Sequence, residues 1–123
     1  TYDFINHQNQ YLGGSSSPGI SLRFKALHTY TENLPEIKFD SNEKKLIGDT
    51  THSSIESGVV NGLVEEIKGI IDNYQNLYPK TNVILTGGDT AFIKSIVSIK
   101  KNSIFAQENL TLIGLNSILN YNA

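Results

Sequence analysis

The sequence predicts an α/β fold in which a mixed sheet is flanked by helices. Short β-rich runs come first as a pair, and later β-rich runs alternate with segments of helical periodicity. This alternation is typical of a layered structure with helices packed on a sheet. A chain of 123 residues can bury the modest core of one domain. We therefore expect a single domain over residues 1–123.

Composition excludes several classes of function. The hydrophobic content of 38% and charged content of 18% fit an ordinary globular protein. A net charge of −2 gives no electrostatic case for nucleic acid or an anionic membrane as partner. The absence of cysteine excludes disulfides, thiol nucleophiles and thiolate metal sites. We find no signal peptide and no apolar run of about 18 residues, so no membrane span is predicted.

The start of the chain suggests a fragment. The first residues, TYDFIN, already have the pattern of a strand, and the chain contains no methionine. We therefore expect it to be part of a longer protein.

The first third of the chain predicts a hairpin and a helix. The β-rich runs TYDFIN and QYLGGSSSPG are joined by HQNQ, a plausible hairpin. A helical pattern then begins at Ile20 and ends at Leu34-Pro35, with Leu22, Ala26 and Leu27 as its recurring apolar positions. The polar segment 36–50 is expected to be an irregular, mobile connection.

The clearest element is a long amphipathic helix. Its apolar residues recur every three or four positions: Ile55, Val59, Leu63, Ile67, Ile70, Ile71, Tyr74 and Leu77. Ser53 and Glu56 suggest a capping box near its start, and Pro79 follows its end. Gly58 and Gly62 lie four residues apart and would let another backbone approach one face. That neighbour could belong to the same domain or to a twofold partner.

The last third predicts strand, helix, strand and helix. NVILTGG is a near-continuous apolar run, typical of a strand buried on both faces. The next helix would bury Phe92, Ile93, Ile96 and Val97. NLTLIGL predicts another strand, and a short helix would end the chain.

The glycines after the apolar run raise the question of a ligand. Glycine permits positive φ or close backbone approach, and ligands of α/β sheets gather at the carboxyl ends of strands. A phosphate is disfavoured because Asp89 would repel it and no P-loop pattern is present. A neutral purine or ribose remains compatible with the glycines, as does a simple strand-to-helix turn.

A second group of polar residues comes just before the long helix. Asp49, Thr50 and Thr51 are all good N-cap residues, and capping would account for them. The same hydroxyls, at the positive end of a helix, could instead bind a polar or anionic ligand. The three histidines show no metal-ligand spacing, and no Ser-His-Asp or paired-carboxylate arrangement stands out.

Several pieces together resemble the carboxyl-terminal half of type III pantothenate kinases: YDFIN…YLGGSSSPGISLRFKAL…LP, IGDTTHSSIESGVVNG, VILTGGD and LTLIGL. They keep the order and spacing of that family, including GxxTxxxxxSGxxxG and TGG, over nearly the whole chain. One departure is the serine run 15–17, where family members usually carry a more apolar stretch. The resemblance implies the superfamily of acetate kinase, sugar kinases, Hsp70 and actin, and hence a ribonuclease H-like half-domain of a two-domain kinase.

The resemblance also implies a function. Such kinases transfer the γ-phosphoryl group of ATP to pantothenate, the first step of coenzyme A synthesis. It implies a cytoplasmic homodimer that uses Mg²⁺ and a monovalent cation, K⁺ or NH₄⁺. Thr51, with Gly48 before it, matches the threonine that contacts pantothenate across the dimer. Thr86, Gly87 and Gly88 match the TGG motif placed against adenosine.

The family's remaining motifs would precede Thr1. These are DxGN for phosphate, GxDR with the catalytic aspartate, and DxGT with the cation-binding aspartate; residues 1–3 are similar to the end of the last. No catalytic or metal-binding residue is therefore expected in these 123 residues, and the chain alone should be inactive. The alternatives are a kinase-like regulatory or accessory protein, associated with transcription and without turnover, and a ligand-free dimerisation module.

Overall fold

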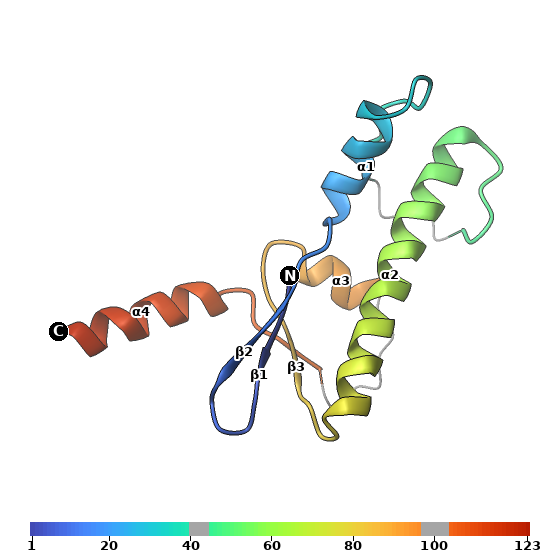
Figure 1. The fold of residues 1–123 in the computed structure, drawn as a ribbon. Coiled ribbons are helices and arrows are strands. Elements are labelled where there is room, and N and C mark those ends of the chain that lie inside the picture. The colour runs from blue at the N-terminus through green and yellow to red at the C-terminus, as the bar shows by residue number, and fades with distance from the viewer. Residues whose placement is uncertain (40–44, 97–103) are drawn as a thin grey trace. The chain divides into compact units, whose positions relative to one another are not determined.

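The computed structural model describes residues 1–39, 45–96 and 104–123. The elements in chain order are β1 (Tyr2–Ile5), β2 (Tyr11–Ser15), α1 (Ile20–Thr29), α2 (Thr51–Leu77), β3 (Val83–Leu85), α3 (Thr90–Ile96), β4 (Ile104–Ala106) and α4 (Leu110–Asn122) (Figure 1). The predicted order of strands and helices is confirmed. The chain forms two compact units, Thr1–Leu63 and Val64–Ala123, which we describe in turn. The single domain expected over residues 1–123 stays a prediction.

The first unit opens with the predicted hairpin. β1 pairs antiparallel with β2, from Tyr2 opposite Ser15 to Ile5 opposite Tyr11. The side-chain carbonyl of Asn6 organises the turn, because it accepts hydrogen bonds from the backbone N–H groups of residues 8 and 10 at 3.0 and 2.9 Å. The hairpin therefore forms from local signals.

Helix α1 buries a different face from the one predicted. Ile20 and Phe24, one turn apart, are buried, whereas Leu22 is 56% exposed. Side chains four residues apart share a helix face, and a residue two positions away lies on the opposite side. The helix also ends at Thr29, five residues before Leu34. The sequence that follows, YTENL, contains threonine and asparagine, which are weak helix formers.

The long helix α2 is confirmed, and its first half completes the core of the first unit. Buried apolar residues of this unit are Ile20, Phe24, Ile37, Ile55, Val59, Val60 and Leu63. The rings of Phe24 and Phe39 lie 6.0 Å apart between centroids, which ties the irregular segment after α1 to this core. That segment is irregular over residues 36–39 and 45–50, as predicted, and residues 40–44 lie outside the described residues.

In the second unit, the buried residues of α2 are Val64, Ile67 and Ile71. The end of the helix is more exposed, and Leu77 is 73% exposed. β3 pairs in parallel with β4, Val83 opposite Ile104 and Leu85 opposite Ala106. The prediction that this strand is buried on both faces is wrong. Successive side chains of a strand point to opposite faces, so Ile84 lies on the other face from Val83 and Leu85. Ile84 is 53% exposed.

The predicted strand at NLTLIGL is also wrong. Asn109 is the N-cap of α4 and residues 110–115 lie within that helix, whereas the strand is β4, which ends at Ala106. A short apolar run does not by itself distinguish a strand from a helix. In α3, Phe92 and Ile93 are half-buried, and Val97 lies outside the described residues.

The described strands thus form one antiparallel and one parallel pair, in a mixed α/β protein. The ribonuclease H-like arrangement stays a prediction. Over the described ranges, no helix is both long and apolar enough to cross a membrane.

Candidate functional site

The start of α2 is held by a reciprocal capping pair. Because the helix begins at Thr51, Thr50 is its N-cap residue. The Ser53 backbone N–H donates to Thr50 Oγ1 at 3.1 Å, and the Thr50 backbone N–H donates to Ser53 Oγ at 2.9 Å. This is the geometry of a capping box, with serine in place of the usual glutamate or glutamine. The predicted box between Ser53 and Glu56 is therefore wrong by one helical turn.

The Ser53 hydroxyl also fixes Asp49. It accepts a hydrogen bond from the Asp49 backbone N–H at 3.0 Å and donates one to Asp49 Oδ1 at 3.1 Å. The hydrogen bond from Ser53, the N–H of Asp49 itself and the charge of Lys45, 3.6 Å away, lower the pKa of the Asp49 carboxyl below its ordinary value. Asp49 is therefore held as a carboxylate within the capping network.

Gly48 lets the chain pass close to the first turn of α2. A Cβ atom at this position would overlap the backbone of Ser53 and Ser54, so a larger residue would force the backbone to move. Steric crowding therefore explains why a glycine is needed at this position of the GxxT pattern. The sequence alone does not reveal this crowding.

The chain just before Gly48 is fixed along α2 by two polar side chains. Ser57 Oγ donates to the carbonyl of Leu46 at 2.6 Å, and Asn61 Nδ2 donates to the carbonyl of Lys45 at 3.2 Å. Leu46 and Ile47, next to these contacts, are 80% and 82% exposed. Sequence reasoning missed these contacts, because nothing in the spacing links residue 46 to residue 57.

Thr51, the residue matched to the pantothenate contact, stands apart from this capping. It is the first residue of α2 and is exposed. The sequence left open whether these threonines cap the helix or bind a ligand. Thr50 caps the helix, whereas the Thr51 hydroxyl lies on the surface at the positive end of the helix.

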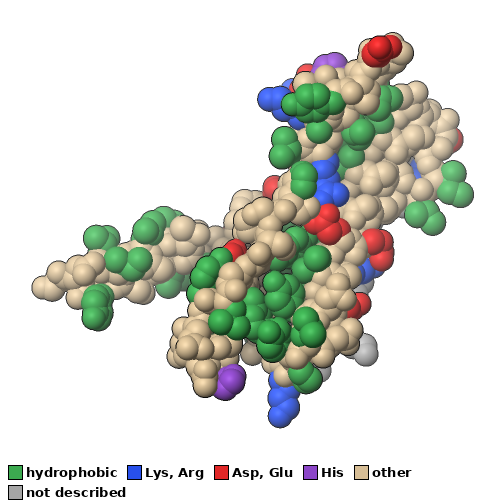
Figure 2. Space-filling view, in the orientation of Figure 1, with side chains coloured by type: hydrophobic (Ala, Val, Ile, Leu, Met, Phe, Trp, Pro, Cys, Tyr) green, Lys and Arg blue, Asp and Glu red, His purple; other side chains and the backbone are tan. Residues whose placement is uncertain are grey.

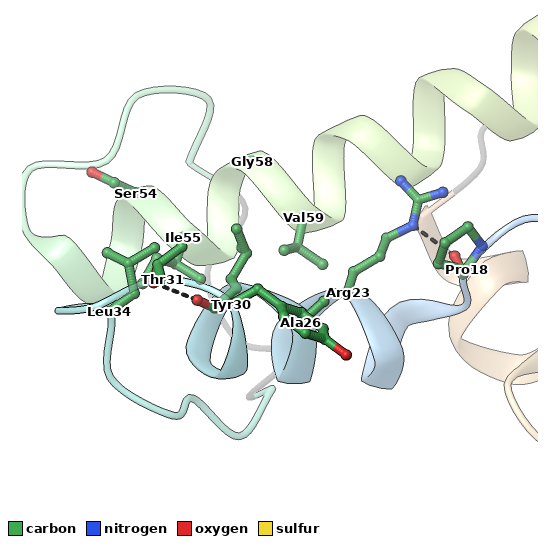
Figure 3. Close-up of a pocket in the computed structure, with 11 residues that line it drawn as sticks. Pro18, Arg23, Ala26, Tyr30, Thr31, Leu34, Ser54, Ile55, Gly58 and Val59 are labelled. Carbon is green, nitrogen blue, oxygen red and sulfur yellow. Dashed lines mark hydrogen bonds between the residues drawn. The ribbon is translucent and has the colours of Figure 1, made fainter.

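A groove of about 700 Å³ lies between α1 and the first half of α2 (Figure 3). Its lining is mainly apolar and includes Ala26, Leu27, Tyr30, Leu34, Ile55 and Val59. At one end, Arg23 donates from Nε to the carbonyl of Pro18 at 2.7 Å. Gly58 also lines the groove, on the α2 side.

Gly58 and Gly62 have no close neighbour in the part of the chain that the structure describes. A Cβ atom at either position would meet no atom within 4 Å. Because α1 lies across the groove from Gly58, both neighbours considered for this glycine face, a segment of the same domain and a twofold partner, stay open.

The TGG motif forms the turn between β3 and α3 in the second unit. Gly87 has a φ of +99°, in the region that favours glycine. The buried Thr90 donates from Oγ1 to the Gly87 carbonyl at 2.7 Å and locks the turn. Thr86 Oγ1 donates to the carbonyl of Glu108 at 3.4 Å. The turn alone accounts for Gly87, whereas Gly88 is exposed and open.

The structure thus groups Gly48, Asp49, Thr50, Thr51 and Ser53 in the first unit. Thr86, Gly87 and Gly88 form a separate group in the second. Within the described ranges, no three His, Cys, Asp or Glu side chains form a group that could hold a metal ion.

Comparison with known proteins decides the family. The sequence profile of type III pantothenate kinases matches residues 1–73 of this chain. The chain belongs to the type III pantothenate kinase family. It is 48% identical to the type III pantothenate kinases of Christiangramia forsetii and Cytophaga hutchinsonii, and 46% identical to that of Flavobacterium johnsoniae. These matches cover 98–99% of this chain and 48–50% of each relative. The chain therefore spans about half the length of the curated relatives that it matches.

Proposed function

We propose that this chain is one half of a kinase that phosphorylates pantothenate with ATP, the first step of coenzyme A biosynthesis. The observation that carries the proposal is the match to kinases of that name at 40–48% identity over nearly every residue of the chain. The match includes both groups of candidate site residues. The alternative, a regulatory relative without turnover, gains no support from these names.

Thr51 is the proposed contact to pantothenate. Its exposed hydroxyl lies on a backbone that the Thr50–Ser53 pair and Gly48 hold in place. The positive end of the α2 dipole would also favour the carboxylate of pantothenate. This group would orient the substrate, so that its primary hydroxyl meets the γ-phosphoryl group in a fixed geometry.

Thr86, Gly87 and Gly88 are the proposed wall for adenosine. The turn presents glycine backbone without side chains, and Asp89 next to it is exposed. A neutral purine or ribose fits such a surface better than a phosphate does, because a carboxylate would repel phosphate charge.

The chemistry itself would depend mainly on positioning and charge neutralisation. ATP supplies the phosphoryl group, and Mg²⁺ with a monovalent cation would offset its negative charge. The aspartate that takes the proton of the hydroxyl is expected in the other half of the kinase. This half alone would therefore be inactive.

A homodimer through α2 is part of the proposal. A Cβ atom at Gly58 or Gly62 would meet no described atom within 4 Å, which leaves room at both positions for the backbone of a second copy. We also propose that the enzyme is cytoplasmic, as expected for coenzyme A synthesis. Pantothenate-dependent ADP release by the complete kinase is the direct test of the proposed activity.

A further inference from the structure

Three polar residues lie on one face of the first half of α2. Ser53, Ser57 and Asn61 are spaced four residues apart, and helix side chains at this spacing stand one above the other. We call them the polar ladder. Each makes a hydrogen bond to the segment 45–50, which precedes the helix and runs beside its first turns (Figure 1). In this region the surface in Figure 2 is mostly tan, the colour of backbone and uncharged polar side chains.

Two members of the polar ladder fasten the beginning of the segment. Residues 45–50 belong to no helix or strand, so their backbone groups need partners other than a helix or a sheet. Ser57 Oγ donates to the carbonyl of Leu46 at 2.6 Å, and Asn61 Nδ2 donates to the carbonyl of Lys45 at 3.2 Å. These two hydrogen bonds fix where the segment starts along the helix.

The third member fastens the end of the segment. Ser53 Oγ accepts hydrogen bonds from the backbone N–H groups of Asp49 and Thr50 at 3.0 and 2.9 Å. Gly48, just before them, is so close to the helix that a Cβ atom there would overlap the backbone of Ser53. The segment is therefore held at both ends, and the residue that follows it is Thr51.

Ser57 and Asn61 have no hydrogen-bond donor left for a ligand. The Ser57 hydroxyl has a single hydrogen, which it donates to Leu46. The Asn61 amide has two, of which one goes to Lys45 and the other to Ser57 Oγ at 3.0 Å. Both side chains thus act through the segment that they hold.

We propose that Ser57 and Asn61 are positioning residues for pantothenate. Helix ends fray, and the first turn of a helix depends on its cap. The cap of α2 is built on the fastened segment, so a loose segment would let the first turn open and the Thr51 hydroxyl move. Binding is weaker when the contact group must be ordered as the ligand arrives. This inference rests on the proposed function, because it takes Thr51 as the contact to pantothenate.

The effect acts from a distance and should be smaller than loss of the contact itself. At about 1.5 Å per residue, Ser57 lies about 9 Å and Asn61 about 15 Å from Thr51 along the helix. Removal of either anchor should weaken pantothenate binding about threefold, which is the low end of the effect of one hydrogen bond. If the polar ladder only stabilised the fold, its loss would lower the Tm and leave the affinity for pantothenate unchanged.

Titration calorimetry on the complete kinase measures the Kd for pantothenate and, separately, the Kd for ATP. Ser57→Ala and Asn61→Ala should each raise the Kd for pantothenate about threefold and leave that for ATP unchanged. Ser57→Thr keeps a hydroxyl and should bind normally. Ser117→Ala is the matched control, because it removes a serine hydroxyl that donates to a helix carbonyl in α4, at 3.0 Å. Neither Kd should change in this control.

A double-mutant cycle separates positioning from stability. In the Thr51→Val background, Ser57→Ala should no longer change the Kd for pantothenate, because its effect passes through Thr51. An equal effect of Ser57→Ala with and without the Thr51 hydroxyl would overturn the inference. So would a lower Tm with no change in Kd, or a rise in the Kd for ATP as large as that for pantothenate. If Ser57→Ala does not fold, Asn61→Ala takes its place in the cycle, since it keeps the hydrogen bond from Ser57 to Leu46.

Turnover separates this inference from the proposed function. ADP release that depends on pantothenate, with an unchanged Kd in both anchor variants, would support the kinase and overturn the positioning role. Pantothenate binding that weakens in the anchor variants as described, without any ADP release, would support the positioning role and contradict the kinase.

Discussion

Thr50 and Ser53 cap each other at the start of α2. Each backbone N–H donates to the side-chain oxygen of the other residue, at 2.9 and 3.1 Å. The pair satisfies an N–H group that the helix cannot pair internally. It also leaves the neighbouring threonine, Thr51, free of the capping role and exposed on a fixed backbone, as a substrate contact requires.

This division of roles predicts the effect of Thr51→Val in the complete kinase. The substitution removes one hydroxyl and keeps the shape, so the KM for pantothenate should rise about tenfold, the cost of one hydrogen bond to a polar or charged group. The KM for ATP should stay unchanged. Steady-state kinetics measures both, with Thr29→Val at the exposed end of α1 as control. An unchanged KM for pantothenate would remove Thr51 from the site.

Gly48→Ala should destabilise the protein. Its Cβ would overlap the backbone of Ser53 and Ser54, and overpacking of this kind costs about 1–3 kcal/mol. Gly69→Ala is the control within α2, where a Cβ meets no atom within 4 Å, and it should stabilise the helix by up to about 1 kcal/mol. Chemical denaturation measures both changes. Equal effects of the two substitutions would show that the chain does not approach α2 closely at Gly48.

Substitution of the two adjacent glycines of TGG by alanine should change the stability of the protein by different amounts. Gly87 has a φ of +99°, so Gly87→Ala should cost about 1–2 kcal/mol. Gly88 is not in that region and has open space around it, so Gly88→Ala should be close to neutral. Thermal unfolding of the two variants tests this order, and a larger loss for Gly88→Ala would contradict the described turn.

The lowered pKa of the Asp49 carboxyl predicts that the stability of the protein depends on pH in the acid range. Its folded pKa lies below the ordinary value of 3.8, mainly because of the Ser53 hydrogen bond. A lowered pKa means that the carboxylate stabilises the fold above pH 3.8, and that this contribution is lost as the pH falls through the lower, folded pKa. The Tm difference between the unchanged chain and Asp49→Asn should therefore shrink below pH 3.8. A difference that stays constant from pH 7 to pH 2 would exclude this role.

The dimer proposal predicts a monomer after substitution of both interface glycines. Gly58→Leu with Gly62→Leu would fill the open face of α2 with bulky side chains and keep a second backbone away. Light scattering should give the double variant half the molar mass of the unchanged protein. Gly69→Leu, at another exposed and open glycine of α2, should leave the dimer intact. A stable dimer after the double substitution would place the interface elsewhere.

The sequence predicted those elements whose signals are local. The spacing of Ile55, Val59, Leu63 and Ile67 can only be one face of a helix, and all four are buried. The hairpin likewise follows from β-rich runs joined by a short polar turn. The family resemblance rested on motifs in order, and the comparisons confirm it.

The sequence could not predict features that depend on distant contacts. LTLIGL is apolar without a clear period, so its helical state was not readable from pattern alone. The steric need for glycine at Gly48 arises from a helix turn that folds back onto it. The exposure of Ile84 depends on how many elements cover the short β3–β4 pair, which periodicity does not specify.

The central claim is that this chain belongs to a working pantothenate kinase, and ADP release tests it most directly. The complete kinase should release ADP from ATP and Mg²⁺ only when pantothenate is added, and the 123-residue chain alone should release none. A complete protein that binds ATP but releases no ADP in response to pantothenate would contradict the claim and favour a regulatory role.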